Sequence, residues 1–403
     1  MKITFVLPGI SIAGGVRVVF EYANRLIDRG HKVYIIYPTI PPRMLSRSKT
    51  KLIGGKVAGG LRNLLRGNNV EWFNVKAKLI RVPTINPKFV NLVKSSVPNS
   101  DILIATSWET VYFVNALPKE KGEKFYFVQH YEIWDIWNSL ECWRKAREIE
   151  NDTSKLPIAM SYIVPDDPYL RKLKELVDTT YTMPLKKITI SSWLEELLEK
   201  RFRQKVYGTI TNGVNFNIFY CDNKKDWNTK KRIILMPYRG ILWKGDLDGL
   251  KALEEVYKKY ENCNLEIWIY GPRKPDRIPK WIKFFERPSD EELRQLYCRA
   301  HIFVGPSWVE GFGLPPMEAM ACMTAVVTTN VGAVPDYTIP GKTAIVVPPQ
   351  NPQKLAEGII YLLEDWNETK KIAERGYEFI RQFTWEKATK EFETTLYNAL
   401  LHD

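Results

Sequence analysis

The sequence predicts an α/β protein made of two Rossmann-like domains that face a central cleft. Apolar runs of strand length alternate with amphipathic stretches of helical spacing, which is typical of parallel sheets covered by helices on both faces. This alternation runs once, stops in a polar segment and then restarts. The chain of 403 residues is long enough for two domains of ordinary size.

The first series of elements starts at residue 2. A buried strand at 2–7 leads into a helix at 16–28, which Gly30 ends, and a strand at 32–37 completes a βαβ unit. Further strand-like runs follow at 102–106, 124–128 and 188–191. The polar segment 207–231 then separates this series from the next.

The second series repeats the pattern. Its predicted strands are 232–236, 265–270, 302–305, 325–328 and 343–347, and its helices are 247–260, 290–299 and 316–323. An amphipathic helix at 385–401 closes the chain. Because ligands of such sheets bind beyond the carboxyl ends of the strands, we look for chemistry in the loops that follow strands.

Composition excludes several protein classes. No run approaches the ~18 apolar residues of a membrane-spanning helix, and residues 1–9 lack the pattern of a signal peptide, so we expect a cytoplasmic protein. The five cysteines, at 142, 221, 263, 298 and 322, contain no C-x-x-C pair. We therefore expect neither disulfides nor a structural zinc site.

The positive charge is local. The formal net charge is +13, but residues 1–100 alone hold 17 basic and 3 acidic side chains. The stretch from Arg29 to Val70 contains nine basic residues, Arg29 included, and no acid. Residues 56–66 form a short basic amphipathic pattern interrupted by glycines. A mobile, solvated loop and an anionic membrane surface both account for this run. Nucleic acid would need the same charge, but no nucleic-acid-binding motif accompanies it.

Two loops carry groups that suit an anionic ligand. Gly14 and Gly15 precede a helix, where backbone amides can approach an anion, but the spacing is not G-x-G-x-x-G, which disfavours a nicotinamide dehydrogenase. Arg239 and Lys244 lie on one short loop after a predicted strand, a spacing that lets both cations reach one diphosphate. Two exposed cations are the plainer interpretation of that pair alone.

Two carboxylates form the most specific pattern, in P-S-W-V-E-G-F-G-L-P-P-M-E-A-M-A from Pro306 to Ala321. Glu310 ends the loop after a strand, and Glu318 lies about two turns further, inside an apolar helix. A carboxylate without a partner is costly there, and a hydroxyl-rich ligand would satisfy it.

These residues resemble the donor site of retaining GT-B glycosyltransferases of family 4. The resemblance rests on Arg239 with Lys244 and on Glu310 with Glu318 in E-G-F-G-L-P-P-M-E-A-M-A; T-N-G-V-N at 211–215 and F-T-W-E at 383–386 are similar to further family segments. It implies an acceptor-binding domain at 1–212 joined by a final helix at 384–403 that crosses back, and a donor-binding domain at 213–383.

The resemblance also implies the role of each donor-site residue. Arg239 and Lys244 would bind the diphosphate of a nucleotide sugar, and Glu318 the ribose. Glu310 and the amides of Gly311, Phe312, Gly313 and Leu314 would bind the transferred sugar, and Phe285 and Glu286, in the loop after residues 281–284, would contact the base. Gly15 would also face the donor. Family members of this type use no metal, and we expect no cofactor.

The first domain departs further from the family. His130, or Gln129 with a shift of one residue, would occupy the family's active-site histidine position, and Gln-His-Tyr-Glu at 129–132 is similar to a rhamnosyltransferase-like subset. Gly14 and Glu109 would face the acceptor, although an exposed loop carboxylate is an equal interpretation of Glu109.

The resemblance therefore implies a metal-independent retaining glycosyltransferase. It would transfer a hexosyl or deoxyhexosyl group to a glycan or lipid-linked acceptor, peripherally at the inner face of the cell membrane and without nucleic acid. His130, Glu310, Arg239 and Lys244 would be its catalytic residues. A nucleotide-sugar hydrolase or epimerase on the same scaffold and a non-catalytic binding protein for nucleic acid or membranes are the alternatives; the sequence leaves the oligomeric state open.

Overall fold

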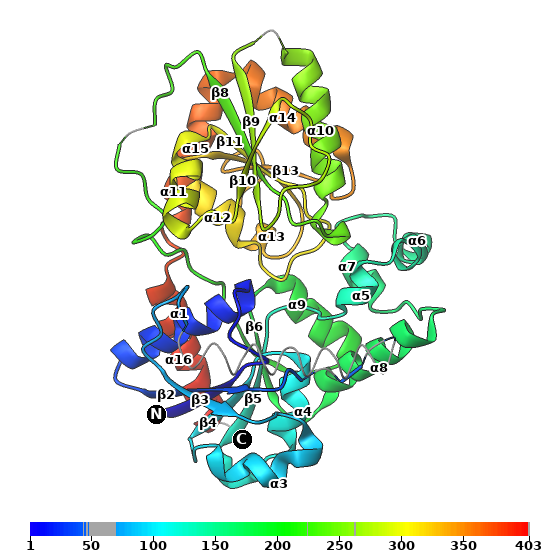
Figure 1. Ribbon diagram of the computed structural model, residues 1–403, viewed down its shortest axis with the longest axis vertical. Coiled ribbons are helices and arrows are strands. Elements are labelled where there is room, and N and C mark those ends of the chain that lie inside the picture. The colour runs from blue at the N-terminus through cyan, green and yellow to red at the C-terminus, as the bar shows by residue number, and fades with distance from the viewer. Residues whose placement is uncertain (43, 46, 48–69, 224, 262, 402–403) are drawn as a thin grey trace. The chain divides into compact units, whose positions relative to one another are not determined.

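Two parallel β-sheets organise the chain in this computed structural model (Figure 1). The structure describes residues 1–42, 44–45, 47, 70–223, 225–261 and 263–401, so the basic amphipathic pattern predicted at 56–66 lies outside the described residues. The chain divides into unit 1 (Met1–Ile136, Val164–Asn212 and Trp385–Asp403) and unit 2 (Trp137–Ile163 and Gly213–Thr384).

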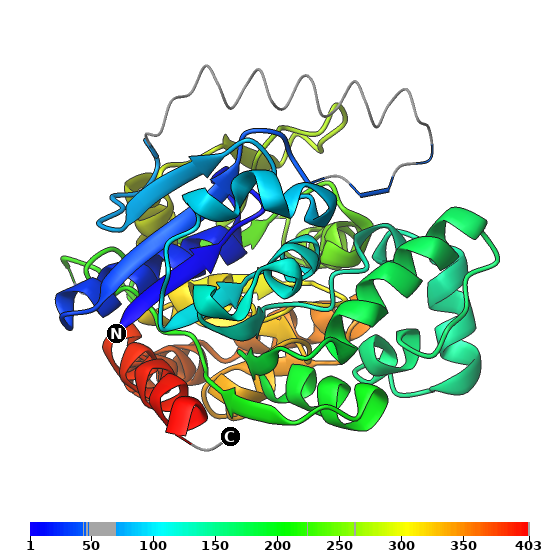
Figure 2. The same ribbon diagram turned by 90° about the horizontal axis from the view of Figure 1, so that it is seen from below.

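Unit 1 contains a seven-stranded sheet in the order β3-β2-β1-β4-β5-β6-β7, in which every pair is parallel. Its strands are β1 (Lys2–Val6), β2 (Lys32–Pro38), β3 (Lys78–Val82), β4 (Ile102–Ala105), β5 (Glu123–Val128), β6 (Lys186–Thr189) and β7 (Val206–Thr209). Figure 2 shows β1, β2 and β3 side by side and running in one direction.

Helices connect these strands. They are α1 (Gly14–Asp28), η1 (Pro87–Phe89), α3 (Val90–Val93), η2 (Lys94–Ser96), α4 (Trp108–Ala116), η3 (Lys119–Lys121), α5 (Trp134–Trp137), α8 (Pro168–Thr182), α9 (Ser192–Glu196), the π-helical turn η4 (Leu197–Arg201) and α16 (Trp385–Leu401). In α1 the buried Val16, Val19, Phe20 and Ala23 recur at helical spacing, as predicted.

Helix α16 packs on unit 1 beside α1, red beside blue in Figure 1. The Phe392 ring lies 4.7 Å from that of Tyr22 and 5.3 Å from that of Phe127, and Glu393 pairs with His31 at 2.5 Å. The predicted return of the last helix to the first unit is confirmed.

Unit 2 contains a six-stranded parallel sheet in the order β10-β9-β8-β11-β12-β13. Its strands are β8 (Arg232–Pro237), β9 (Leu265–Gly271), β10 (Ile282–Glu286), β11 (Ile302–Gly305), β12 (Ala325–Thr329) and β13 (Ile345–Val347). Its helices are α6 (Leu140–Ile149), α7 (Leu156–Met160), η5 (Leu242–Lys244), α10 (Asp246–Tyr260), α11 (Asp290–Arg299), α12 (Leu314–Ala321), α13 (Val334–Tyr337), α14 (Pro352–Glu364) and α15 (Trp366–Ile380). Helices α10 and α14 pack together on one side of the sheet, and α11 and α12 lie on the other (Figure 1).

The segment Trp137–Ile163 differs from the predicted division, which placed all of 1–212 in the first domain. It packs with unit 2, where the Trp143 ring meets the Trp308 ring edge-on at 5.5 Å and Arg147 donates to Gln350 at 3.0 Å. Sequence periodicity marks helices but not the sheet on which they pack, so this prediction was wrong.

Three strands were missed by the sequence patterns. All three are edge strands, and β7 also overlaps the predicted polar seam. All four residues of β7 are only partly buried, so its side chains lack the apolar signal of a central strand.

The expectation of no disulfide is also wrong. Cys221 and Cys298 are joined by a disulfide that spans 77 residues of sequence, with Cα atoms 5.6 Å apart. Their separation in the sequence gave no sign that folding brings them together. Among the described helices, none combines the length and the apolar character needed to cross a membrane.

The packing of α16 yields a test. We expect Phe392→Ala to destabilise unit 1 by roughly 3–5 kcal/mol, because the ring is fully buried against three aromatic side chains. Hydrogen exchange of the β1 and β2 amides reports this loss separately from unit 2. Leu401→Ala, on the same helix at a residue that is 75% exposed, should change protection by less than about 0.5 kcal/mol. Equal effects of the two substitutions would contradict the packing.

Candidate active site

The strand order of unit 2 places a switch point between β8 and β11, the two central strands. Connections leave these strands toward opposite edges of the sheet, so the loops at their carboxyl ends diverge and leave room for a ligand. The loops are residues 238–245 after β8 and 306–313 after β11. They carry Arg239, Lys244 and Glu310.

A buried carboxylate shapes the first loop. Asp246, at the start of α10, accepts backbone N–H bonds from Arg239 at 3.0 Å, Gly240 at 2.6 Å and Ile241 at 3.2 Å. Burial raises the pKa of Asp246, and these three amides oppose that rise because they favour the carboxylate. The backbone on which Arg239 stands is thereby fixed.

The two loops touch at Gly245. Its φ is +67°, and a Cβ placed there would lie 1.9 Å from the carbonyl oxygen of Pro306, so no other residue fits without movement. The Trp308 amide donates to the carbonyl of Trp243 at 2.9 Å. Direct backbone contact therefore holds Lys244 next to the loop of Glu310.

Lys244 and Glu310 form an ion pair across the switch point. Lys244 Nζ lies 2.7 Å from Glu310 Oε1, and the Ser307 hydroxyl donates to the same oxygen at 2.7 Å. Each side chain of the pair keeps 20% of its surface exposed. Burial lowers the pKa of Lys244, whereas the neighbouring Glu310 carboxylate acts in the opposite direction.

Glu318 lies on α12 and is 8% exposed. The Tyr297 hydroxyl donates to Glu318 Oε2 at 3.1 Å and lies 2.9 Å from the Tyr270 hydroxyl. The Arg239 guanidinium lies over the Tyr270 ring, 5.8 Å from its centroid. Because a carboxylate can only accept, Tyr297 gives its proton to Glu318 and accepts one from Tyr270. Sequence reasoning missed both tyrosines, which stand on other elements.

Glycines shape the turn before α12. Gly313 caps the helix at φ +100°, and its carbonyl accepts from Tyr337 Oη at 2.8 Å. A Cβ on Gly332 would lie 2.7 Å from the Cβ of Glu310, which leaves no space for a side chain beneath the turn. The predicted turn from Gly311 to Leu314 thus leads directly into the N-terminus of the helix of Glu318.

Two tryptophans support the loop of Glu310. Trp308 donates its indole N–H to Asp248 Oδ2 at 2.7 Å, and its ring receives the edge of Trp143 from α6. Trp143 in turn donates to the carbonyl of Trp137 at 2.8 Å. No local pattern links residue 143 with residue 308, so only the fold shows this support.

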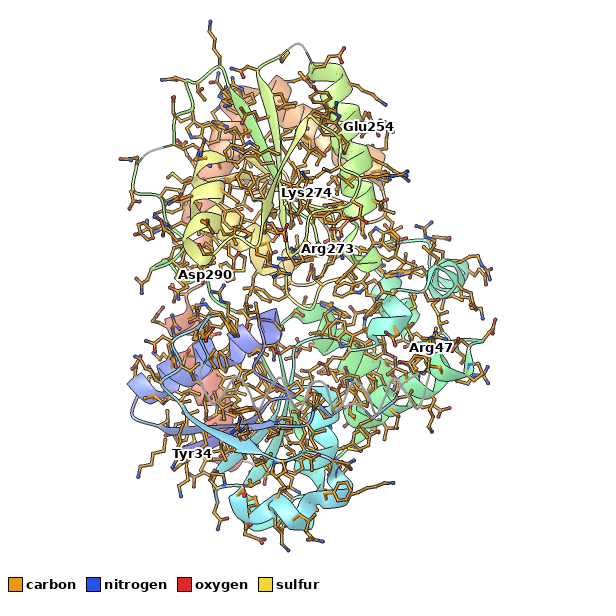
Figure 3. The ribbon with its side chains drawn as sticks, in the orientation of Figure 1. Tyr34, Arg47, Glu254, Arg273, Lys274 and Asp290 are labelled. Atoms are coloured by element: carbon orange, nitrogen blue, oxygen red, sulfur yellow. A yellow bond between two sulfur atoms is a disulfide. The ribbon has the colours of Figure 1, made fainter. Side chains whose placement is uncertain are left out.

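The residues predicted to contact a base lie differently from expectation. Phe285 and Glu286 belong to β10 and not to a loop, and the Phe285 ring packs at 5.3 Å on Trp268. The Phe284 ring instead reaches Gly271 at the carboxyl end of β9. Arg273 and Lys274 follow on the loop after β9 (Figure 3).

Unit 1 has its own group at the carboxyl ends of β1 and β5. The Gln129 amide lies against Gly15, 3.4 Å from the position of a Cβ, whereas Gly14 is exposed with open space around it. His130 is 7% exposed, and its ring lies 4.6 Å from that of Trp134 while Nδ1 meets the carbonyl of Tyr131 at 2.9 Å. Of the two alternatives, Gln129 is the side chain beside the glycine turn.

A pair of carboxylates follows β4 and β5. Glu132 accepts from the amide of Trp108, the first residue of α4, at 2.5 Å, and Glu109 lies in the first turn of that helix. Burial raises the pKa of Glu109 to about 7, and burial together with the charge of Glu109 raises that of Glu132. Glu109 is therefore not the exposed loop carboxylate of the plainer interpretation.

Comparison with known proteins identifies the second half of the chain. Residues 221–379 match the family model of glycosyl transferases group 1. These residues form a group 1 glycosyltransferase domain. It contains Arg239, Lys244, Glu310 and Glu318.

The chain is also similar to a protein named as a glycosyltransferase. An uncharacterised glycosyltransferase of Methanocaldococcus jannaschii is 28% identical over 212 residues, which are 50% of this chain and 56% of that protein. The chain thus matches about half the length of this curated relative.

Solved structures match over the whole chain. Sucrose-phosphate synthase from Thermosynechococcus elongatus has a TM-score of 0.69 at 19% identity, covering 99% of each chain. Anabaena HepE in complex with UDP-glucose has a TM-score of 0.65 at 15% identity, covering 99% of this chain and 100% of that one. The chain that carries the group 1 domain has the GT-B fold.

The carboxylate pair of unit 1 predicts a pH dependence of stability. Glu109 has a pKa of about 7 in the folded protein and an ordinary value of 4.5, so the folded state holds the extra proton between these values. Stability should therefore fall as pH rises through this window, by up to about 3 kcal/mol, and stay reduced above it. Glu109→Gln should reduce the fall in urea midpoints between about pH 5 and pH 8, while the buried Glu132 keeps part of it. The exposed Glu120→Gln should keep it; an unchanged profile in Glu109→Gln would refute the buried pair.

Proposed function

We propose that the protein is a retaining glycosyltransferase that moves a sugar from a nucleotide-diphosphate donor to an acceptor hydroxyl. The observation that carries this proposal is the Lys244–Glu310 ion pair at the switch point of a group 1 domain, with Glu318 held on the helix that follows. This site therefore combines a cation that can stabilise a leaving diphosphate with carboxylates that can accept hydrogen bonds from hydroxyl groups.

The donor would bind in unit 2. Arg239 and Lys244 neutralise the diphosphate, Glu318 accepts hydrogen bonds from the ribose, and Glu310 with the turn from Gly311 to Leu314 binds the transferred sugar. The Glu318 carboxylate suits this role because it accepts from the Tyr297 hydroxyl and each carboxylate oxygen can accept more than one hydrogen bond. The base would lie near the carboxyl ends of β9 and β10, where Phe284 is the aromatic side chain next to Gly271.

The reaction would proceed by attack on the same face that the diphosphate leaves. The bond from the anomeric carbon to the phosphate oxygen breaks, a bond to the acceptor oxygen forms, and the acceptor's proton passes to the leaving phosphate. Arg239 and Lys244 stabilise the charge that develops on that phosphate, which is the task a metal would otherwise perform. Glu310 orients the sugar and forms no covalent bond.

The acceptor would bind in unit 1, at the carboxyl ends of β1, β4 and β5. Gly14, Glu109 and either His130 or Gln129 lie on these loops. The Gln129 amide oxygen is buried and makes no hydrogen bond to another described residue, so a hydroxyl placed beside Gly15 would supply a donor for it.

Donor-site substitutions test this function. Glu318→Gln, Arg239→Ala and Lys244→Ala should each lower kcat/KM at least ten-fold, because each removes a charge that meets the donor. Lys251→Ala, an exposed cation on α10, is the matched control and should keep wild-type turnover. The donor is found first by a thermal-shift screen of UDP-, GDP-, ADP- and dTDP-sugars; UDP-glucose heads the screen because Anabaena HepE was solved with it.

Two outcomes would overturn the assignment. Wild-type rates in all three donor-site variants would exclude this site. Release of free sugar at full rate without any acceptor would show a hydrolase instead.

We further propose that the acceptor is presented at an anionic membrane surface. The sequence between Glu71 and Asp101 contains five basic residues and no acid. On its exposed segment Lys88 and Lys94 flank Phe89 and Leu92, which are 49% and 77% exposed. Basic side chains beside exposed apolar ones match the interface of anionic lipids.

Vesicle binding tests this partner. The protein should co-sediment with vesicles that contain phosphatidylserine more than with neutral ones. Phe89→Ser with Leu92→Ser should weaken that binding several-fold, whereas Tyr361→Ser, an exposed aromatic residue of unit 2, should not. Binding that ignores lipid charge would refute the membrane proposal and leave the transferase assignment untouched.

A further inference from the structure

Three cysteines of unit 2 gather from three different elements. Cys221 stands on the segment that enters the unit, Cys298 on α11, and Cys322 directly after α12. Their sulfur atoms all lie within 4.8 Å of one another, and the first two form the disulfide. The fold thus brings together three side chains, among the described residues, that could bind one metal ion.

The cluster lies away from the proposed donor site. A cavity of about 470 Å³ is lined by Cys221, Cys298, Ile233 and His301. Ile233 is at the amino-terminal end of β8 and His301 immediately precedes β11, whereas Lys244 and Glu310 follow the carboxyl ends of the same strands. The cavity gives solutes access to the sulfurs from the opposite edge of the sheet.

We propose that Cys221, Cys298 and Cys322 form a thiol site that, once reduced, binds a single soft divalent cation of the Zn²⁺ class. A dithiol reductant opens the site: it transfers two electrons and two protons to the disulfide, becomes a disulfide itself and leaves three thiols in the protein. The cation then replaces the three thiol protons, which pass to solvent. The proposal does not depend on the transferase function.

The geometry fits such an ion. Zn–S bonds of about 2.3 Å in a tetrahedron place the sulfurs about 3.8 Å apart, within the 4.8 Å limit of the cluster. Two of the three cysteines are partly exposed toward the cavity and Cys322 is buried, so three ligands close one side and water can occupy the fourth position.

A lysine side chain lies beside the three cysteines. A divalent cation with three thiolates carries a net charge of −1. The Lys225 ammonium interacts with Cys322 and is held by the carbonyl oxygens of Tyr297 and Ala300 and by the Thr324 hydroxyl, at 2.7 Å from the last. Burial lowers the pKa of Lys225 to about 7, so this side chain offsets that charge only in part near neutral pH.

Cadmium binding to the full chain tests the site. The protein is reduced with a dithiol and freed of reductant without air. It is then titrated with Cd²⁺, and thiolate-to-cadmium charge-transfer absorption in the ultraviolet is recorded. We expect the absorption to saturate at one equivalent in the reduced protein and to be absent in the oxidised one. Zn²⁺ should abolish it by competition.

Single cysteine variants decide the ligands. Cys322→Ser and Cys298→Ser should each weaken binding at least ten-fold, whereas Cys142→Ser and Cys263→Ser, outside the cluster, should bind like the wild type. The two cluster variants allow the test to proceed if one of them fails to fold. No charge-transfer band in the reduced protein, or equal binding by both cluster variants and the wild type, would overturn the proposal.

Discussion

The ion pair between Lys244 and Glu310 is the contact on which the site of unit 2 depends. The two charges stand on loops that leave neighbouring strands in different directions, and each keeps only a fifth of its side chain in contact with solvent. Removal of either partner would leave the other charge poorly solvated, a cost of roughly 3–5 kcal/mol for a fully buried pair and less here. The close backbone packing at Gly245 is what allows the two loops to meet.

Much of this architecture follows from periodicity and motif spacing. The βαβ alternation predicted both sheets, and E-G-F-G-L-P-P-M-E located Glu310 and Glu318 correctly on a loop and the next helix. Residues that support the site could not be predicted in this way. Tyr297 reaches Glu318 from another helix, and Trp143 reaches Trp308 from a segment expected in the other unit; such contacts depend on tertiary packing, which leaves no regular spacing in the sequence. The disulfide was not predicted because its two cysteines are 77 residues apart in the sequence. The three missed strands lie at sheet edges, where the apolar pattern of a strand is weak.

The two units hold their carboxylates in opposite electrostatic states. In unit 2 a lysine stabilises the ionised form of Glu310. In unit 1 burial raises the pKa values of Glu109 and Glu132, and the charge of Glu109 raises that of Glu132 further, so the pair favours a bound proton near neutral pH. A protonated carboxyl can donate a hydrogen bond, whereas Glu310 can only accept. A sugar-accepting substrate that binds as proposed would therefore meet both a hydrogen-bond donor and a hydrogen-bond acceptor in the carboxyl pair of unit 1.

The Lys244–Glu310 pair also suggests how a donor would change the site. In the structure Glu310 Oε1 already receives Lys244 and Ser307, so a sugar hydroxyl would have to compete for that oxygen. A diphosphate brings a charge larger than that of one carboxylate and would draw Lys244 toward itself. Glu310 would then lose its ion pair with Lys244, and the hydroxyls of a sugar could donate hydrogen bonds to the carboxylate in its place. Binding of the diphosphate would thus prepare the carboxylate for the sugar, and a nucleotide without its diphosphate would leave the ion pair closed.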